Sequence, residues 1–527
     1  MSTFKDALII GGGHNGLVCA CYLAKAGKKV TILEKRHIVG GAAVTEEFHP
    51  GFKNSTASYT VSLLNPKIIK DLNLHEHGLQ VILRPQSNFF PLLSGDSLSI
   101  FGKIEETRAE FARFSQKDAD ALPKFYDMLT SVADLLREEL LRTPPNVGGG
   151  IMDLIKAGTF GLRAKKLSME QRTNAMEMFT KSASDVLDAW FENDHIKAAF
   201  GFDSIVGNFG APSTPGSAYV LLHHVFGEVN GVQGAWGHAI GGMGAITEAM
   251  RKEAEALGVK ILTEQDVKRV IIENKQAIGV ELEDGTQHFA SRIVSNVGPK
   301  LLYTHMVDEM HLEEDFIRRV KGFKVGSGTF RMNVALSELP DFIAKPGTNL
   351  QPHHQSGVII APTLSYMEKA FYDAKLFGWS ASPIIEMLIP STVDNTLAPE
   401  GQHVASLFCQ QFAPELPDGE SWDDHRETVA DLIIESVTRY APNFKASIIA
   451  RQIHSPLDLE RKFGLMGGDI FHGALGIDQL WTNRPFMGQA NYKTPINNLY
   501  ICGSGTHPGG GVTGAPGHNA AKELLKS

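Results

Sequence analysis

The sequence predicts an α/β protein built around a doubly wound, Rossmann-type parallel sheet. An apolar run at residues 7–10 leads through a glycine-rich turn and a helical stretch to a second apolar run at 30–33. Strand patterns return at residues 259–297, and another apolar run at 498–502 precedes a glycine-rich end. Short, wholly apolar runs are typical of buried parallel strands. The first three elements therefore predict a βαβ unit.

Length and composition limit the classes of protein to which the chain can belong. Its 527 residues are enough for two or three domains. A formal net charge of −9 argues against a nucleic-acid partner. Only four cysteines occur, which indicates a reducing compartment without a disulfide framework. The first strand starts almost at the N-terminus and no apolar run reaches membrane-spanning length, so we expect a cytoplasmic protein.

The glycine-rich turn at residues 11–16, GGGHNG, has the spacing of a dinucleotide site. Gly11 permits a tight turn, Gly13 lets backbone amides approach a pyrophosphate, and Gly16 allows close packing of helix on strand. The N-terminus of the following helix favours negative charge. Glu34, at the end of the second strand, can accept hydrogen bonds from ribose hydroxyls and disfavours a 2′-phosphate. The pattern therefore predicts a dinucleotide other than NADP.

A glycine pair, Gly40 and Gly41, follows the ribose carboxylate closely. Here the sequence resembles the large FAD family of amine oxidases and phytoene desaturases, in which a loop with such a pair lies along the pyrophosphate and ribityl chain. The resemblance implies FAD as the cofactor. Members of that family often carry arginine directly after the pair, whereas this chain has Ala42 and Ala43. The cationic contact of those relatives is therefore missing.

The C-terminal segment GSGTHPGGGVTGAPG, residues 503–517, predicts a second contact with the cofactor. A helix beginning near Thr513 would direct its N-terminal dipole at the flavin edge that gains negative charge on reduction. Gly511 would let the backbone reach the flavin ring. The segment is similar to the signature of the phytoene desaturase branch, which includes bacterial carotenoid desaturases and retinol saturase. Some of those relatives have aspartate where this chain has Ser504.

The turn, the ribose acid, the glycine pair and the cap together give a set of expected FAD ligands. The resemblance adds the backbone of Val267 at the adenine and Asn296 at the end of the fourth strand. The full set is Gly11, Gly13, Asn15, Gly16, Glu34, Lys35, Gly40, Gly41, Ala42, Val267, Asn296, Gly503, Ser504, Gly511, Val512 and Gly514.

The α/β pattern is interrupted twice, which predicts a discontinuous cofactor domain with an inserted α+β substrate domain. Residues from about 86 are rich in helical periodicity, and the second interruption predicts an antiparallel sheet with helices. We expect the FAD-binding domain at 1–85, 225–310 and 486–527, and the substrate domain at 86–224 and 311–485.

Cysteine and histidine patterns indicate little nucleophilic or metal chemistry. Cys19 and Cys21 are two positions apart on a helix, so their side chains diverge, which argues against a redox pair. No histidine spacing matches a metal site. His507 in the cap and the pair His223 and His224 beside the re-entry into α/β structure are the candidates for a catalytic role.

These features predict an FAD-dependent oxidoreductase that passes a hydride between flavin N5 and a carbon–carbon bond of its substrate. The resemblance implies a lipophilic substrate, such as an isoprenoid or carotenoid-like compound, and a desaturase, saturase or isomerase type of reaction. Two alternatives stay open. One is an amine oxidase, which an aromatic cage beside the flavin would favour. The other is an FAD-stabilised regulatory or scaffold protein with little turnover.

Residues 150–167, GIMDLIKAGTFGLRAKKL, combine apolar residues at near-helical spacing with four cations. One interpretation is a peripheral membrane contact through which a lipophilic substrate enters. The other, which we favour from the sequence, is an ordinary amphipathic helix packed on its neighbour.

Overall fold

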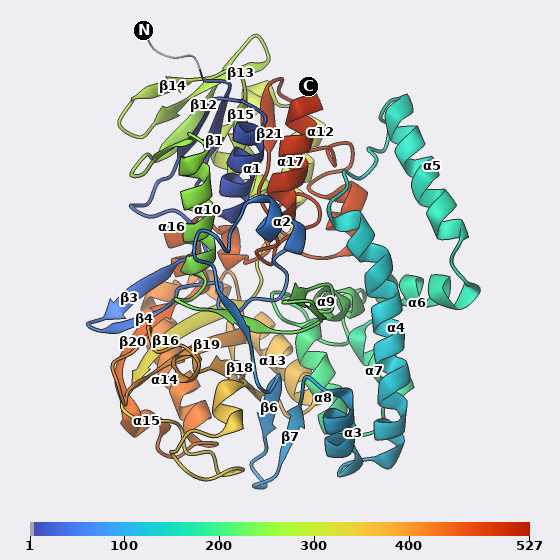
Figure 1. Cartoon of the computed structure of the whole chain (residues 1–527), viewed down its shortest axis with the longest axis vertical. Coiled ribbons are helices and arrows are strands. Elements are labelled where there is room, and N and C mark those ends of the chain that lie inside the picture. Colours follow the sequence, from blue (N-terminus) through green and yellow to red (C-terminus); the bar gives the residue numbers. More distant parts are fainter. Residues whose placement is uncertain (1–4, 527) are drawn as a thin grey trace.

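The computed structural model describes residues 5–526, and the predictions for residues 1–4 and 527 at the ends of the expected cofactor domain lie outside this range. A five-stranded sheet forms the upper part of the molecule in Figure 1, in the order β11–β2–β1–β15–β21. Every neighbouring pair in it is parallel. Its strands are β1 Ala7–Ile10, β2 Val30–Leu33, β11 Lys260–Leu262, β15 Ile293–Ser295 and β21 Leu499–Ile501. The expected Rossmann-type α/β fold is thereby confirmed.

Helix α1, His14–Lys25, packs between two other helices, α10, Gly244–Ala256, and α17, Ala515–Lys526. Small residues let these backbones touch: a Cβ on Gly517 would lie 2.2 Å from the carbonyl oxygen of Asn15. The C-terminal helix begins two residues after its expected start at Thr513. The two ends of the chain therefore form one packed layer on the parallel sheet.

A seven-stranded sheet forms the lower part of the molecule (Figure 1), in the order β20–β16–β19–β18–β17–β6–β7. All its pairs are antiparallel except β17 with β6. Alternate residues of β19 point into different cores: Phe408 packs among the helices of residues 104–226, and Leu407 and Cys409 pack under α14. The strands and this helix are β6 Asn88–Pro91, β7 Ser97–Ile100, β16 Thr329–Leu336, β17 Gly357–Ile360, β18 Trp379–Leu388, β19 His403–Phe412, β20 Ile448–His454 and α14 Trp422–Thr438.

Helices fill most of the segment between β7 and the return to the parallel sheet. They are α3 Ile104–Ala112, α4 Gln116–Leu140, α5 Ile151–Lys165, α6 Met169–Thr180, α7 Ala183–Trp190, α8 Asp194–Gly201 and α9 Ser217–His223. No residue of α5 is buried, so our favoured interpretation of residues 150–167, a helix packed through its apolar face, is wrong. No helix in the described part of the chain is long and apolar enough to cross a bilayer.

The remaining elements connect the two sheets. A three-stranded antiparallel meander, β12–β13–β14, lies beside the parallel sheet. The division of the chain into domains stays a prediction. The connecting elements are α2 Pro66–Asp71, β3 Thr45–His49, β4 Phe52–Ser55, β5 Val81–Leu83, β10 Gly237–Ala239, β12 Val267–Glu273, β13 Gln276–Leu282, β14 Gln287–Phe289, α12 Glu314–Gly322, α13 Leu364–Phe377 and α16 Pro456–Phe463.

A fully buried arginine, Arg484, organises the loops that lead to the C-terminal cap. Its guanidinium donates hydrogen bonds of 2.7–3.3 Å to backbone carbonyl oxygens only. Burial lowers its pKa to about 10, so the side chain keeps its charge at neutral pH. The acceptors are Phe471, Gly473, Ala474, Gln479 and Ser504.

Replacing this arginine by an apolar side chain of similar length should therefore destabilise the fold. We expect Arg484→Met to lower the free energy of unfolding by about 3 kcal/mol, because buried carbonyl groups lose a charged donor. Urea denaturation measures the change. Arg318→Met, at a side chain 81% exposed, is the control and should change little. Equal losses in the two variants would contradict the organising role.

Candidate functional site

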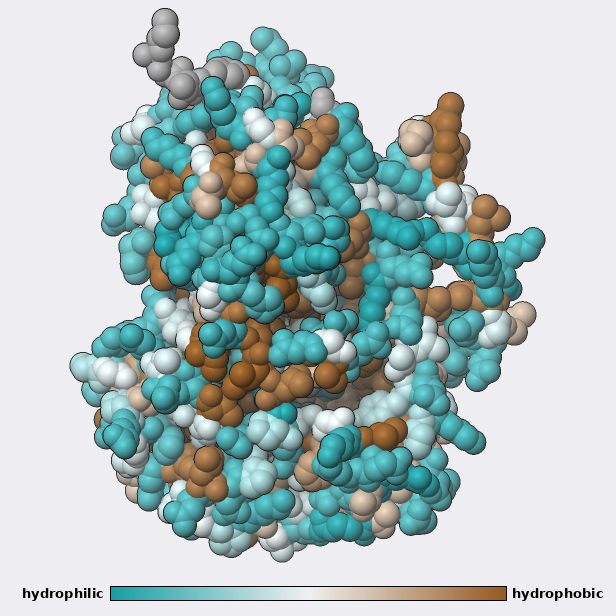
Figure 2. Space-filling view, in the orientation of Figure 1, coloured by the Kyte–Doolittle hydropathy of each residue, from teal (hydrophilic) through white to brown (hydrophobic). Residues whose placement is uncertain are grey.

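A single cavity of about 700 Å³ joins the carboxyl ends of the parallel strands to the seven-stranded sheet. The glycine-rich turn after β1 lines one end of it, and Tyr59 and Phe408 line the other. Figure 2 shows apolar residues gathered across the middle of one face, where the surface is hollowed. Ligands of α/β sheets bind at the carboxyl ends of the strands, which is where this cavity lies.

The turn after β1 leaves no room for side chains. A Cβ on Gly13 would lie 2.8 Å from Nδ2 of Asn296, and one on Gly16 would lie 2.4 Å from the carbonyl oxygen of Gly11. Gly11 also has a φ of +92°, which disfavours other residues. Helix α1 has no side-chain cap and no acid in its first turn, so no side chain competes with an anionic ligand for the free backbone N–H groups at its N-terminus. This bare backbone cradle fits a pyrophosphate.

Glu34 is a buried carboxylate at the end of β2 and lines the cavity. Its Oε2 accepts a hydrogen bond of 2.7 Å from the amide of Gly12, and its Oε1 accepts one of 2.9 Å from the amide of Arg36. Burial raises the pKa of this carboxyl, while the two amides oppose the shift. Each carboxylate oxygen retains capacity for a second donor, so the group fits a ribose hydroxyl as well.

The C-terminal cap reaches the same cavity. Ser504, Gly511 and Val512 line it, and Oγ of Ser504 accepts a hydrogen bond of 3.0 Å from Nδ2 of Asn15. Gly511 has a φ of +103°, and a Cβ there would meet Leu63 at 2.4 Å. The two ends of the chain thus close around one space.

The full set of expected FAD ligands divides into two groups. Most line the cavity, namely Gly11, Gly13, Asn15, Glu34, Lys35, Gly40, Gly41, Ala42, Val267, Asn296, Ser504, Gly511 and Val512. Three glycines lie behind the lining and serve packing instead. A Cβ on Gly503 would lie 2.4 Å from the carbonyl oxygen of Asn296, and one on Gly514 would meet Ile68 at 2.9 Å. Gly16 is the third.

The three candidate histidines occupy different places. His224 lines the main cavity, stacks on Trp236 at 5.8 Å and contacts the carbonyl oxygen of Val220 through Nδ1 at 2.8 Å. His223 lines a separate cavity of about 180 Å³. His507 lines neither: its Nε2 lies 3.0 Å from the carbonyl oxygen of Glu139. The geometry therefore brings only His224 to the cavity.

A largely buried polar cluster at the end of the cavity away from the glycine-rich turn was missed by the sequence reasoning. The Tyr59 hydroxyl donates to Glu386 at 2.5 Å, and the Tyr59 ring stacks on Phe408 at 4.9 Å. The Arg331 guanidinium lies 4.8 Å from the centre of the Tyr59 ring. Burial raises the pKa of Glu386, and nearby Arg84 opposes the shift. Tyr59 and Glu386 are far apart in the chain and match no motif, so no sequence signal could have joined them.

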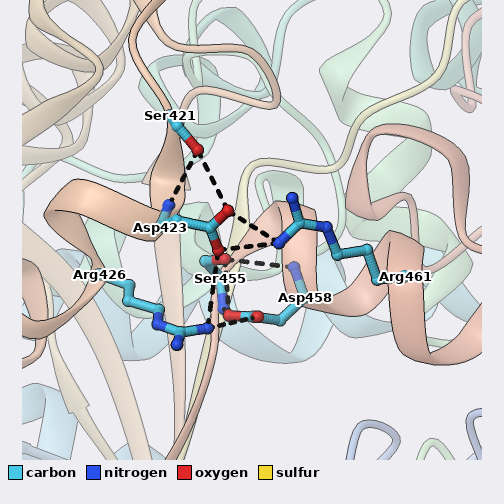
Figure 3. Close-up of polar contacts among 6 residues, drawn as sticks. All are labelled: Ser421, Asp423, Arg426, Ser455, Asp458 and Arg461. Carbon is cyan, nitrogen blue, oxygen red and sulfur yellow. Dashed lines mark hydrogen bonds and ion pairs between the residues drawn. The ribbon is translucent and has the colours of Figure 1, made fainter.

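Helix α16 forms part of the cavity wall and is held by the ion-pair network in Figure 3. Ser455 and Asp458 form a capping box at its N-terminus. Arg426 binds Asp458 at 2.8 Å, and Arg461 binds Asp423 at 2.8 Å. These contacts fix the helix against α14 and so hold in place the part of the cavity wall formed by residues 460–466.

None of the four cysteines lines the cavity. All four cysteines are free and buried, and burial raises the pKa of Cys502, next to Cys19, well above its ordinary value. Residues 5–526 contain no group of three potential ligands that could hold a metal ion.

A five-stranded parallel sheet, a backbone cradle, a buried carboxylate at the end of β2 and a C-terminal segment that closes on the same cavity are the features expected of an FAD-dependent oxidoreductase. The model of one protein family, flavin containing amine oxidoreductase, matches residues 16–329. The chain belongs to this family, whose cofactor is flavin.

Curated relatives align over nearly the whole chain. Pyridine nucleotide-disulfide oxidoreductase domain-containing protein 2 of Rattus norvegicus is 40% identical, over 99% of this chain and 93% of its own. A limonene dehydrogenase subunit of Castellaniella defragrans is 27% identical, over 99% and 94%. A lycopene-forming phytoene desaturase of a Paracoccus species is 24% identical, over 97% and 95%. The similarity to phytoene desaturases expected from the cap is thereby confirmed.

Solved structures share the fold. Cyclohexylamine oxidase from Brevibacterium oxydans superposes with a TM-score of 0.58 at 14% identity, over 99% of both chains. At this identity the likeness concerns the fold alone.

Glu34 gives a direct test of the proposed cofactor cradle. We expect Glu34→Gln to lower the flavin content of the purified protein, because the amides of Gly12 and Arg36 donate to different oxygens of Glu34 and the NH2 group of glutamine would replace one of these acceptors with a donor. The ratio of flavin absorbance to protein absorbance measures the flavin content, and circular dichroism checks that the fold persists. Glu281→Gln, at a surface ion pair, is the control. Full flavin content in Glu34→Gln would remove this residue from the cofactor site.

The buried histidines predict sensitivity to acid. Burial lowers the pKa of His223 to about 3 and that of His507 to about 4, below the ordinary 6.5. The unfolded chain therefore takes up protons first as the pH falls, and stability is lost between about pH 6.5 and 4. Each histidine contributes a slope of about 1.4 kcal/mol per pH unit there.

The slope can be measured as the free energy of unfolding in urea across this pH range. Replacing both residues, in His223→Gln/His507→Gln, should make the loss with falling pH shallower. His37→Gln, at an exposed position, is the control and should leave the slope as it is. An unchanged slope in the double variant would show that these histidines are protonated in the folded protein as well.

Proposed function

We propose that the protein transfers a hydride between FAD and a carbon–carbon bond of a lipophilic substrate. The observation that carries the proposal is the apolar wall of the cavity beyond the dinucleotide cradle. That wall includes Leu63, Val206, Trp236, Phe408 and Ile470. Bound FAD supplies the hydride acceptor or donor at N5 of its ring. The walls provide placement and exclude water from the reacting carbons.

The arrangement of aromatic rings disfavours an amine as substrate. A cationic amine is held well between ring faces or by a carboxylate. Tyr59 and Phe408 are instead stacked on each other, with 24° between their planes, which leaves no gap between them for an ammonium group. Glu386 is already bound by Tyr59 and flanked by the charges of Arg84 and Arg331. An uncharged substrate fits these walls better.

The names of two relatives agree with an uncharged substrate. The limonene dehydrogenase and the phytoene desaturase are named after isoprenoid hydrocarbons. We infer an isoprenoid-like or similarly apolar compound as the substrate class, with desaturation, saturation or isomerisation as the reaction type.

Tyr59 and Glu386 are the groups placed to handle the proton that accompanies the hydride. Removing hydrogen from adjacent carbons releases one hydride and one proton. We propose that the oxygen of Tyr59 takes this proton while its own hydroxyl proton passes to Glu386, 2.5 Å away. The raised pKa of Glu386 makes that carboxylate a better acceptor. In the reverse direction the same two groups return the proton.

Anaerobic visible spectra of the flavin test the proposal. We expect an isoprenoid alkene to bleach the oxidised flavin and primary amines to leave it unchanged. Tyr59→Phe should slow the bleaching by about 10²-fold with normal flavin content, because the proton loses its relay. Tyr366→Phe, whose hydroxyl binds the carbonyl oxygen of Pro383 away from the cavity, is the control.

Two outcomes would contradict this function. Bleaching by amines and not by alkenes would establish an amine oxidase. A flavin that neither alkenes nor amines bleach, and that no alkene reoxidises once dithionite has reduced it, would indicate a scaffold in which FAD only stabilises the fold.

A further inference from the structure

Helix α5 turns its polar side toward the rest of the protein. Asp153 accepts a hydrogen bond of 3.1 Å from the amide of Asn146, and Arg163 pairs with Glu139 of α4 at 2.7 Å. Phe160 is the one large apolar residue on this side, with its ring centre 4.5 Å from that of Trp481. The helix is thus held to its neighbours mainly by hydrogen bonds and ion pairs.

The apolar side of α5 faces outward. Ile151 is 77% exposed, Leu154 69% and Leu162 66%, and Ile155 and Met152 are exposed too. Ile151, Ile155, Gly158 and Leu162 follow helical spacing and form one stripe. Figure 1 shows the helix at the edge of the molecule, and Figure 2 shows apolar atoms along it. The apolar side of α5 therefore faces away from the protein, whereas a helix packed on the core of a globular protein turns its apolar side inward.

The cations of this segment lie where an anionic surface would meet them. Lys165 and Lys166, both exposed, follow the apolar stripe at the C-terminal end of α5. Neither makes an ion pair with any residue of the described chain. Asp153 is the sole acid between residues 150 and 167, although the chain as a whole carries a net charge of −9. The stripe with its two lysines has the composition of an interfacial helix.

We propose that α5 docks on a lipid bilayer that contains anionic headgroups. The apolar stripe enters the boundary between headgroups and acyl chains, and Lys165 and Lys166 contact the phosphates. The helix lies in the plane of the bilayer surface. This proposal does not depend on the proposed reaction, although a bilayer would also hold a lipophilic substrate.

A second copy of the chain is a poorer occupant for this surface. At a rise of about 1.5 Å per residue, the 15 residues of α5 span about 22 Å, and a helix is about 10 Å wide. Two such faces cover on the order of 200 Å² each, whereas a stable interface needs about 800 Å² from each partner. A bilayer has no such requirement for a matching surface.

Vesicle flotation with the full-length flavoprotein tests the proposal. We expect the protein to float with vesicles of phosphatidylcholine and phosphatidylserine, and less with phosphatidylcholine alone. Ile151→Gln/Leu154→Gln/Ile155→Gln/Leu162→Gln should lower the bound fraction at least about tenfold, because these side chains supply the inserted surface. Lys165→Gln/Lys166→Gln should remove the preference for phosphatidylserine.

A control variant replaces exposed apolar residues elsewhere. Met310→Gln/Leu376→Gln, at positions 79% and 65% exposed, should float like the unmodified protein. Flavin content checks that each variant is folded. Failure of the unmodified protein to float, or equal flotation of the fourfold variant, would overturn the proposal. A dimer that the fourfold variant loses in analytical ultracentrifugation, without vesicle binding, would assign α5 to self-association instead.

Discussion

The structure depends on backbone contact between segments that lie far apart in the chain. A Cβ on Gly503 would meet the carbonyl oxygen of Asn296 at 2.4 Å, and one on Gly517 would meet that of Asn15 at 2.2 Å. Any side chain at these glycines would separate the N-terminal unit, the fourth strand and the C-terminal cap. Since all three segments line the cavity, the cofactor cradle exists only in the complete fold.

Buried polar groups hold the loops around these contacts. The Arg484 guanidinium donates hydrogen bonds to backbone carbonyl oxygens, and the Glu34 carboxylate accepts hydrogen bonds from two backbone amides. Because the partners of both groups are backbone atoms, each group fixes the path of the main chain. Buried charges are costly unless they are fully bonded, so such groups tolerate little displacement. The Asn15 side chain donates a hydrogen bond to the hydroxyl of Ser504 and thereby links α1 to the C-terminal cap.

Motifs in the sequence predicted the parallel strands and the meeting of the two chain ends, whereas contacts that no motif encodes were missed. Strands at 7–10 and 30–33 have the expected bounds, because a buried parallel strand and the turn after it are encoded by adjacent residues. His507 was chosen for its place beside the cap glycines, yet its ring contacts α4. The pair of Tyr59 and Glu386 depends on how two sheets meet, which no periodicity encodes. Helix α5 was identified as amphipathic, but only the fold shows which side faces outward.

The two ends of the cavity meet different physical demands. The dinucleotide end is built from backbone atoms at glycines, and a backbone changes little when side chains are substituted. The far end is lined by side chains such as Phe408 and Val206, which belong to a different packed cluster from the glycine turn. Substrate preference can therefore change while the cofactor cradle persists. This division accounts for relatives that align with almost the whole chain and yet carry names taken from different substrates.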